Sequence, residues 1–296
     1  PDDAGQRLSN LIRHPEFYAY LNAGNFDEEL TIPSPIRESL DIEIRIMPYS
    51  EDQFLLVARD VTQVKRLENL RREFVANVSH ELKTPLTVLQ GYLEMMDEPQ
   101  QTPPAMLKKA VENMNAQSTR MANLVDQLLT LSRMETPSND VFDHEVDMPA
   151  LLEQLESEAK RLNEVKQHKI EFDVAPVRIY GKENLLRSAM QNLITNAINY
   201  TPDGGEIKVT WKTVAGGVEF SVKDNGKGIA AEHLPRLTER FYRVEDDRNS
   251  ASGGTGLGLS IVKHAIEHHN SQLDINSSLE KGSRFSFRIP SGLLVS

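Results

Sequence analysis

Cysteine is absent from this chain of 296 residues. Its absence excludes disulfides, thiolate nucleophiles and cysteine-based zinc or iron–sulfur sites, and it is typical of a reducing compartment. Long hydrophobic runs are missing too, since no stretch approaches the roughly 18 apolar residues that a membrane-spanning helix needs. The chain starts at Pro1 with no charged and then apolar leader. We therefore expect a cytoplasmic fragment of a longer protein.

Basic residues are fewer than acidic residues. The chain has 33 Lys and Arg against 44 Asp and Glu, a formal net charge of −11. A domain that binds duplex nucleic acid usually presents a basic face to the phosphates, so we expect no direct binding of nucleic acid. The chain also lacks the Walker motif, Gly-x-x-x-x-Gly-Lys followed by Ser or Thr, which excludes that kind of phosphate loop.

Residues 40–59 have the pattern of two short strands. From Leu40 to Ile46 four apolar residues alternate with charged ones, which is the period of a half-buried strand. A polar turn at 48–52 and an apolar run from Phe54 to Ala58 complete an antiparallel hairpin. The preceding segment, 6–23, is helix-like, and with two strands it is too small to form a whole domain.

The apolar period becomes helical after Val61. Apolar residues recur every third or fourth position as far as Met96, and after a proline-rich break at 99–104 a second stripe runs from Leu107 to about Glu135. Two long helices joined by a short loop cannot bury both stripes alone. We therefore expect a homodimer in which two hairpins form a four-helix bundle.

The last region mixes strands and helices after a linker at 136–140. Strands separated by helices, with the final strands in hairpins, predict an α/β two-layer sandwich. The expected strands are 170–174, 207–211, 218–222, 273–275 and 285–289, and the expected helices are 149–164, 182–200 and 257–269.

The first long helix carries the most informative segment. The ten residues from Asn77 to Leu86 read Asn-Val-Ser-His-Glu-Leu-Lys-Thr-Pro-Leu. His80 has only small or polar neighbours three and four positions away, so it faces away from the apolar stripe. Glu81 places a carboxylate beside it, and Pro85 removes the helical hydrogen bond to the Glu81 carbonyl, at a cost of about 3 kcal/mol. A histidine, a carboxylate and local strain together indicate a functional site.

These ten residues resemble the phosphoacceptor motif of sensor histidine kinases. The resemblance implies that His80 attacks the γ-phosphate of ATP, and that Glu81 orients the imidazole ring and takes its other proton. It also implies transfer of the phosphoryl group to an aspartate of a cognate response regulator. Glu81 and Thr84 form a Glu-x-x-Thr pattern that the family associates with dephosphorylation of that regulator.

A second motif lies in the expected helix 182–200. Asn192 and Asn196 are one turn apart on one face, although asparagine is unfavourable in a helix interior. They resemble the Asn-rich motif of the same family, which implies that they bind nucleotide together with Asn199 and Tyr200. Amide oxygens suit Mg²⁺, so Asn196 is the expected metal ligand. The family often has lysine at the position of Asn199.

Two glycine motifs and an aromatic motif extend the resemblance. Asp224 opens the first glycine motif, and the resemblance implies that its carboxylate accepts the adenine amino group. The second motif leads directly into a helix, an arrangement that offers backbone N–H groups to phosphates. The polar stretch 245–252 is expected to form a lid over ATP. The other nucleotide-binding residues that these motifs imply are Gly226, Gly228, Ile229, Phe241, Arg243, Gly254, Thr255, Gly256, Leu257 and Gly258.

The resemblance implies an α+β multidomain chain. Residues 1–62 end in Asp-Val-Thr, similar to the junction that follows PAS domains, and are expected to be the C-terminal part of a PAS-like sensory domain. Residues 63–136 are expected to form an antiparallel helical hairpin for dimerisation and histidine phosphotransfer. Residues 141–292 are expected to form the α/β-sandwich ATP-binding domain shared by gyrases, chaperones and histidine kinases.

Within that family, 86–96 and 236–244 resemble the phosphate-regulon sensor kinases of gram-negative bacteria. This likeness extends over nearly the whole chain. It implies a parent protein anchored in the bacterial inner membrane and a response regulator that switches on phosphate-starvation genes. It also implies a phosphate transporter and its accessory regulator as partners.

Two other interpretations compete with an active kinase. His264 and His268 fit the His-x-x-Glu-His pattern of one class of zinc hydrolases, but the chain leaves only 28 residues for a distant third ligand. The second alternative is a catalytically silent dimeric scaffold. The presence of His80, Glu81, Asn196 and Asp224 argues against it.

Overall fold

The computed structural model describes residues 5–37, 39–51, 53–96, 103–135, 142, 144–244 and 254–295. The chain divides into two compact units, residues 1–79 and 80–296. The expected lid at 245–252 and the linker at 136–140 lie outside the described residues, as does most of the break between the long helices.

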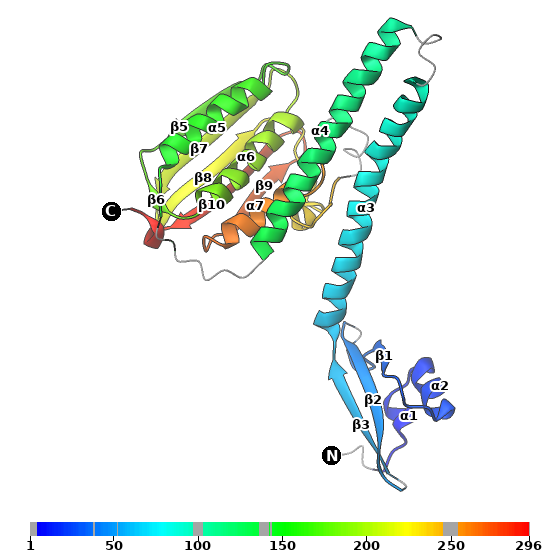
Figure 1. Cartoon of the computed structure of the whole chain (residues 1–296). Helices are drawn as coiled ribbons and strands as arrows, with labels where there is room; N and C mark the ends of the chain where they lie inside the picture. The colour runs from blue at the N-terminus through cyan, green and yellow to red at the C-terminus, as the bar shows by residue number, and fades with distance from the viewer. Residues whose placement is uncertain are drawn as a thin grey trace. The chain divides into compact units, whose positions relative to one another are not determined.

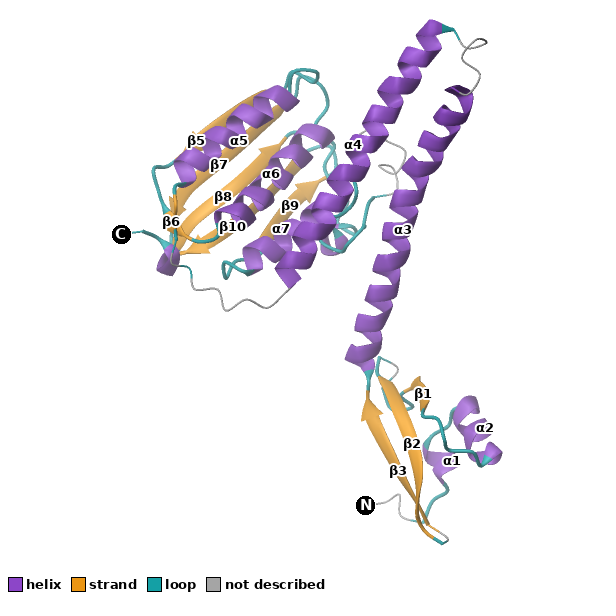
Figure 2. Cartoon of the chain, viewed as in Figure 1, coloured by secondary structure: helices purple, strands orange, loops and turns teal. Residues whose placement is uncertain are grey.

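The first unit is built on a three-stranded antiparallel sheet in the order β1-β2-β3 (Figure 2). The strands are β1 (Leu30–Pro33), β2 (Asp41–Ser50) and β3 (Gln53–Asp60). The β2–β3 hairpin confirms the expected pair of strands, whereas β1 was not foreseen. The alternating isoleucines of β2 point to one side, where Ile44 and Ile46 form a core with Phe17 and Ile32.

Two short helices, not one, precede this sheet. The sequence predicted a single helix over 6–23, but the structure has α1 (Leu8–Leu11) and α2 (Pro15–Ala23). Pro15 occupies the first turn of α2, and a proline disfavours helical geometry in the residue before it, here the extended His14. The proline therefore starts a new helix and ends the earlier one.

A small polar cluster joins the sheet to α3 (Thr62–Met96). The Asp60 carboxylate accepts a hydrogen bond from the Thr62 N–H (2.9 Å). Hydrogen bonding with the side chain of Thr62, and then with its backbone, lowers the pKa of Asp60. The Thr62 hydroxyl in turn accepts from the backbone N–H of Asp41 (2.8 Å). The last residue of β3 and the first strand position of β2 are thus both fixed to the start of α3.

Two long helices, α3 and α4 (Pro104–Glu135), confirm the expected change to a helical period. In the second unit they run antiparallel, because Tyr92 bonds to Asn113 while Glu81, eleven residues earlier, bonds to Arg120. Pro85 lies inside α3 without ending it. Among the described helices, none combines the length and apolarity needed to cross a membrane.

The rest of the second unit is an α/β sandwich (Figure 1). Its five-stranded sheet has the order β5-β7-β8-β10-β9, in which β5 and β7 are parallel and the other pairs antiparallel. Three helices, α5, α6 and α7, cover one face of this sheet. The bounds are α5 (Met148–Leu162), β5 (Lys169–Val174), α6 (Glu183–Tyr200), β7 (Glu206–Val214), β8 (Gly217–Asp224), α7 (Gly258–Glu267), β9 (Leu273–Ser278) and β10 (Gly282–Pro290).

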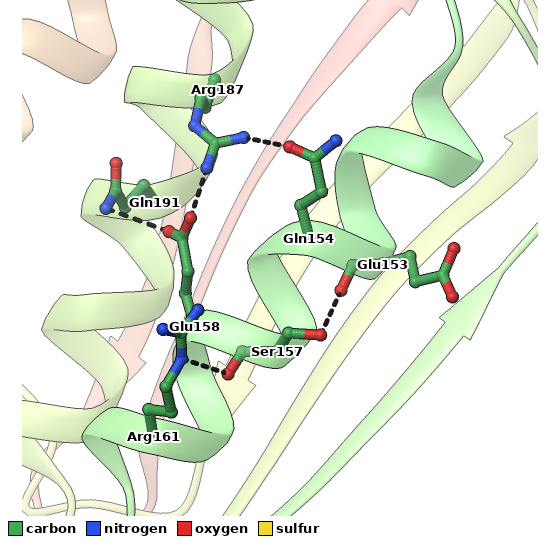
Figure 3. A network of polar contacts seen from close by, with 7 residues as sticks. All are labelled: Glu153, Gln154, Ser157, Glu158, Arg161, Arg187 and Gln191. Atoms are coloured by element: carbon green, nitrogen blue, oxygen red, sulfur yellow. Dashed lines mark hydrogen bonds and ion pairs between the residues drawn. The ribbon is translucent and has the colours of Figure 1, made fainter.

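Apolar packing and a polar network hold the helices of the sandwich in place. Trp211 and Phe220 of the sheet are fully buried, as are Met190 of α6 and Ile266 of α7. At the outer side of the helical layer, Arg187 of α6 donates to Gln154 and Glu158 of α5 (Figure 3). The pair β4 (Glu145–Val146) and β6 (Ile179–Tyr180), which the sequence did not reveal, completes the fold.

Candidate nucleotide and phosphoacceptor site

A cavity of about 660 Å³ opens beside α6 in the second unit. It is large enough for a nucleotide, since small-molecule sites usually measure a few hundred to a thousand Å³. Its wall comes from α6, from the ends of β8 and β10 and from α4. Two glycine segments, 224–229 and 254–258, complete it. The expected site residues on this wall are Asn192, Asn196, Asn199, Tyr200, Asp224, Gly228, Ile229, Arg243, Gly254, Thr255, Gly256 and Gly258.

Helix α6 presents its asparagines to this cavity because its opposite face is apolar. Met190 and Ile194 of α6 are buried, so Asn192 and Asn196 lie together at the cavity. The Asn192 amide nitrogen donates to the Ser188 carbonyl (2.8 Å), which fixes the amide. No hydrogen bond to the Asn196 amide occurs within the described part of the chain. Its oxygen is a suitable ligand for a hard cation such as Mg²⁺.

Asp224 lies at the buried base of the cavity. Its side chain is 8% exposed, and Oδ1 accepts backbone N–H bonds from Gly226 (2.8 Å) and Ser283 (3.2 Å). Burial raises the pKa of this carboxyl, while the two N–H donors oppose the shift. Among the described residues no donor bonds to the second carboxylate oxygen, which can accept a hydrogen bond from an amino group of a ligand.

Glycine is required at two turns of the cavity wall. Gly228 has φ +70°, and a Cβ there would lie 1.9 Å from the Ser278 carbonyl oxygen. Gly256 has φ +74°, and a Cβ there would lie 2.7 Å from the backbone of Phe241. Any other residue would be strained and would collide with a neighbouring chain segment. Both glycines therefore allow two chain segments to pack closely against each other at the cavity wall.

Three expected site residues do not line the cavity but support it from behind. Gly226 contributes the N–H that holds Asp224. The Phe241 N–H bonds to the Gly256 carbonyl (2.9 Å). Leu257 is fully buried, so its side chain belongs to the core. A motif shows which residues are adjacent along the chain, and it cannot show which of them point outward.

Several cavity residues were missed by the sequence analysis. Lys227 lies inside the first glycine motif, and its Nζ is 5.8 Å from the centre of the Tyr200 ring. Ser283 comes from β10, far along the chain, and no local pattern marks it. The contribution of α4 was also missed. It consists of Ala116, Gln117, Thr119, Arg120, Asn123 and Gln127.

His80, Glu81 and Thr84 lie together on α3, outside the cavity wall. His80 is exposed, as the helical pattern predicted. The Glu81 carboxylate accepts from the Arg120 guanidinium (3.0 Å), and Arg120 itself lines the cavity. The Thr84 hydroxyl donates to the His80 carbonyl (3.2 Å). Threonines in helices often form such bonds.

The two histidines of the zinc alternative have other contacts. His268 Nε2 lies 2.9 Å from the Met134 carbonyl of α4. His264 Nδ1 lies 3.6 Å from Glu267, and burial lowers the pKa of His264. Among the described residues, no group of three His, Asp or Glu side chains could hold a metal ion.

Two known domain families match the parts of the chain that contain these residues. Residues 70–137 match the His Kinase A (phospho-acceptor) domain. Residues 181–293 match the ATPase domain described as histidine kinase-, DNA gyrase B- and HSP90-like. The chain is 35% identical over 270 residues to the sensor-like histidine kinase SenX3 of Mycolicibacterium smegmatis, covering 88% of the chain and 69% of that protein. The chain belongs to the sensor histidine kinases.

The likeness to one type within this family is higher. The chain is 46% identical over 288 residues to the phosphate regulon sensor protein PhoR of Pseudomonas aeruginosa, covering 97% of the chain and 65% of that protein. It is therefore a sensor histidine kinase of the PhoR type, and it spans about two thirds of this relative's length. The crystal structure of the histidine kinase ThkA in complex with the response regulator TrrA shares the fold, with a TM-score of 0.58 and 20% identity over 97% of the chain and 86% of the matched one.

Proposed function

We propose that this chain is the signalling part of an ATP-dependent sensor histidine kinase that phosphorylates His80. The observation that carries the proposal is the composition of one cavity wall. Asp224 and Asn196 share it with Arg120, and Arg120 is bonded to Glu81, the neighbour of His80. Arg120 of α4 thus connects the proposed nucleotide site with the residue beside His80, which supports the proposal.

Each of these residues has a distinct role in the proposed reaction. Asp224 accepts the adenine amino group, and its burial makes this bond selective for a donor. Asn196 would hold Mg²⁺, which would neutralise phosphate charge. A ring nitrogen of His80 forms a bond to the γ-phosphorus as the bond to the β,γ-bridging oxygen breaks, releasing ADP. Glu81 accepts the proton from the other ring nitrogen.

The phosphoryl group then passes to an aspartate of a response regulator. The identity to PhoR supports a role in phosphate-starvation signalling, with a parent protein anchored in the bacterial inner membrane and a phosphate transporter and its accessory regulator as partners. The same kinase also dephosphorylates the regulator, with Thr84 as the residue that serves this reaction. The proposed domains are the PAS-like part (1–62), the phosphotransfer hairpin (63–136) and the ATP-binding domain (141–292).

Labelled ATP tests the kinase reaction directly. The wild-type protein should acquire an acid-labile label, because phosphohistidine is hydrolysed in acid. His80→Gln should bind ATP and dimerise but acquire no label, and Asn196→Ala should bind nucleotide without autophosphorylation. Asp224→Ala should lose nucleotide affinity in calorimetry. Label on the His80→Gln protein at the normal rate would show that the phosphorylated residue is another one.

A further inference from the structure

Arg120 connects two parts of the site that the motifs treat separately. It lies on α4, outside every motif recognised in the sequence. Its guanidinium lines the nucleotide cavity and donates to Glu81 Oε2 at 3.0 Å, in a pair whose side chains are 33% and 27% exposed. One cation therefore borders both the cavity and the carboxylate beside His80.

One face of α4 forms part of the cavity wall. Arg120, Asn123 and Gln127 follow one another at helical spacing and all line the cavity. Gln127 Oε1 accepts from the hydroxyl of Thr255 (2.6 Å), which belongs to the second glycine segment. If Asp224 holds the adenine, as proposed above, phosphates bound at the second glycine segment would lie beside Thr255 and therefore close to this face of α4.

The other cations of the wall are placed differently. Lys227 lies within the first glycine motif beside the Tyr200 ring, close to the adenine end. Arg243 comes from the segment before the expected lid. Arg120 has the planar fork of donors that matches two phosphate oxygens, and it is the cation that α4 contributes to the wall.

We propose that Arg120 is a catalytic arginine that changes partner, from Glu81, to which it is bonded in this structure, to the terminal phosphate of bound ATP. The inference rests on the proposed function and extends it. While Arg120 is bonded to Glu81, its guanidinium occupies the carboxylate oxygen Oε2. When ATP binds, the guanidinium moves to the γ-phosphate oxygens and stabilises their charge as phosphorus passes to His80. Glu81 is then free to take the imidazole proton.

Calorimetry with two nucleotides tests this exchange. In the presence of Mg²⁺, Arg120→Gln should bind a non-hydrolysable ATP analogue at least tenfold more weakly than the wild type. ADP lacks the terminal phosphate and should bind within twofold of the wild type. Arg120→Lys keeps the charge without the fork and should be intermediate. Lys108→Gln removes an exposed cation of the same helix that pairs with Glu112, and it should change neither affinity.

A second variant tests the competing partner. Glu81→Gln removes the charge that holds Arg120, so the analogue should bind at least as tightly as to the wild type, with ADP unchanged. Unaltered analogue affinity in Arg120→Gln overturns the inference, and so does an equal loss for both nucleotides, which indicates a structural role. Weaker analogue binding by Glu81→Gln also contradicts it. A wild-type protein that binds neither nucleotide overturns the proposed function itself.

Discussion

The sandwich and the helical hairpin bury their apolar residues to very different extents. In the sandwich, Trp211 of β7 and Phe220 of β8 are fully buried within a single chain. In the hairpin, Val125 and Leu129 of α4 are 43% and 51% exposed, and other large apolar side chains of both helices are exposed as well. The sandwich therefore has a complete core of its own. The hairpin has an apolar surface that a second copy of the chain would cover.

Removing the largest side chain of the sandwich core should have the largest effect. Trp211 is completely buried, and its indole N–H donates to the Val177 carbonyl (3.2 Å). Trp211→Ala should lower the free energy of unfolding of the sandwich by about 3–5 kcal/mol. Urea unfolding of the whole chain, monitored through the loss of nucleotide binding, measures this change in stability. Lys212→Ala, at the exposed neighbouring position, should unfold close to the wild type.

A charge on the apolar stripe should separate the two copies without harming the sandwich. Val125→Glu should weaken dimerisation by at least 100-fold, about 2.8 kcal/mol, because the carboxylate would be buried among apolar side chains. Light scattering at micromolar concentration should show a monomer that still binds ADP. Lys109→Glu places the same charge at an exposed position of α4 and should remain dimeric. A wild-type protein that is monomeric at this concentration would contradict the expected dimer.

The sequence predicted elements well where one periodicity persists. The stripes of α3 and α4 and the alternation in β2 gave the positions of these elements to within a few residues. Short pairings such as β1 with β2, or β4 with β6, escaped because two to four residues carry no measurable period. The single predicted helix over 6–23 was wrong because Pro15 disfavours helical geometry at His14.

For the candidate site, too, the sequence predicted only what is encoded locally along the chain. Motifs located the residues that lie close along the chain, such as Asn192, Asn196 and Asp224. They could not reveal Ser283 or Arg120, which reach the cavity only through the pairing of β8 with β10 and the position of α4. The motifs also cannot distinguish a cavity residue from one that supports it. Leu257 illustrates this, since its side chain lies in the core.

Lys166, which contacts the C-terminal end of α6, should affect both the stability of the sandwich and its affinity for nucleotide. Lys166 Nζ donates to the carbonyls of Ile198 (3.0 Å) and Asn199 (2.6 Å), which are left without helical partners at the C-terminus. Lys166→Met should lower the free energy of unfolding by about 1–2 kcal/mol. It should also weaken ADP binding several-fold, because Asn199 and Tyr200 line the cavity.

Lys160→Met is the matched control for this prediction. Lys160 lies on α5, is 68% exposed and pairs with Glu156 on the same helix. Its loss should leave both unfolding and ADP affinity close to those of the wild type. If Lys166→Met unfolds like the wild type, the contacts with α6 contribute no net stability.

The smallest predicted effect concerns a single hydroxyl of the hairpin. Thr84→Ala should leave autophosphorylation nearly intact and slow dephosphorylation of the response regulator about tenfold, or about 1.4 kcal/mol of barrier. The reason is that hydrolysis of an aspartyl phosphate needs a water molecule held in line, and Thr84 and Glu81 are neighbours on the helix at a spacing of three. Decay of the purified phosphorylated regulator, with ADP present, measures the rate.

Thr87 offers a control with the same local geometry. Its hydroxyl donates to the Lys83 carbonyl (3.0 Å), just as that of Thr84 donates to the His80 carbonyl (3.2 Å). If the two hydroxyls only bond back to the helix, Thr84→Ala and Thr87→Ala should affect decay equally. A phosphatase role requires that Thr84→Ala alone slows decay, and that Thr84→Ser, which keeps the hydroxyl, restores most of the rate.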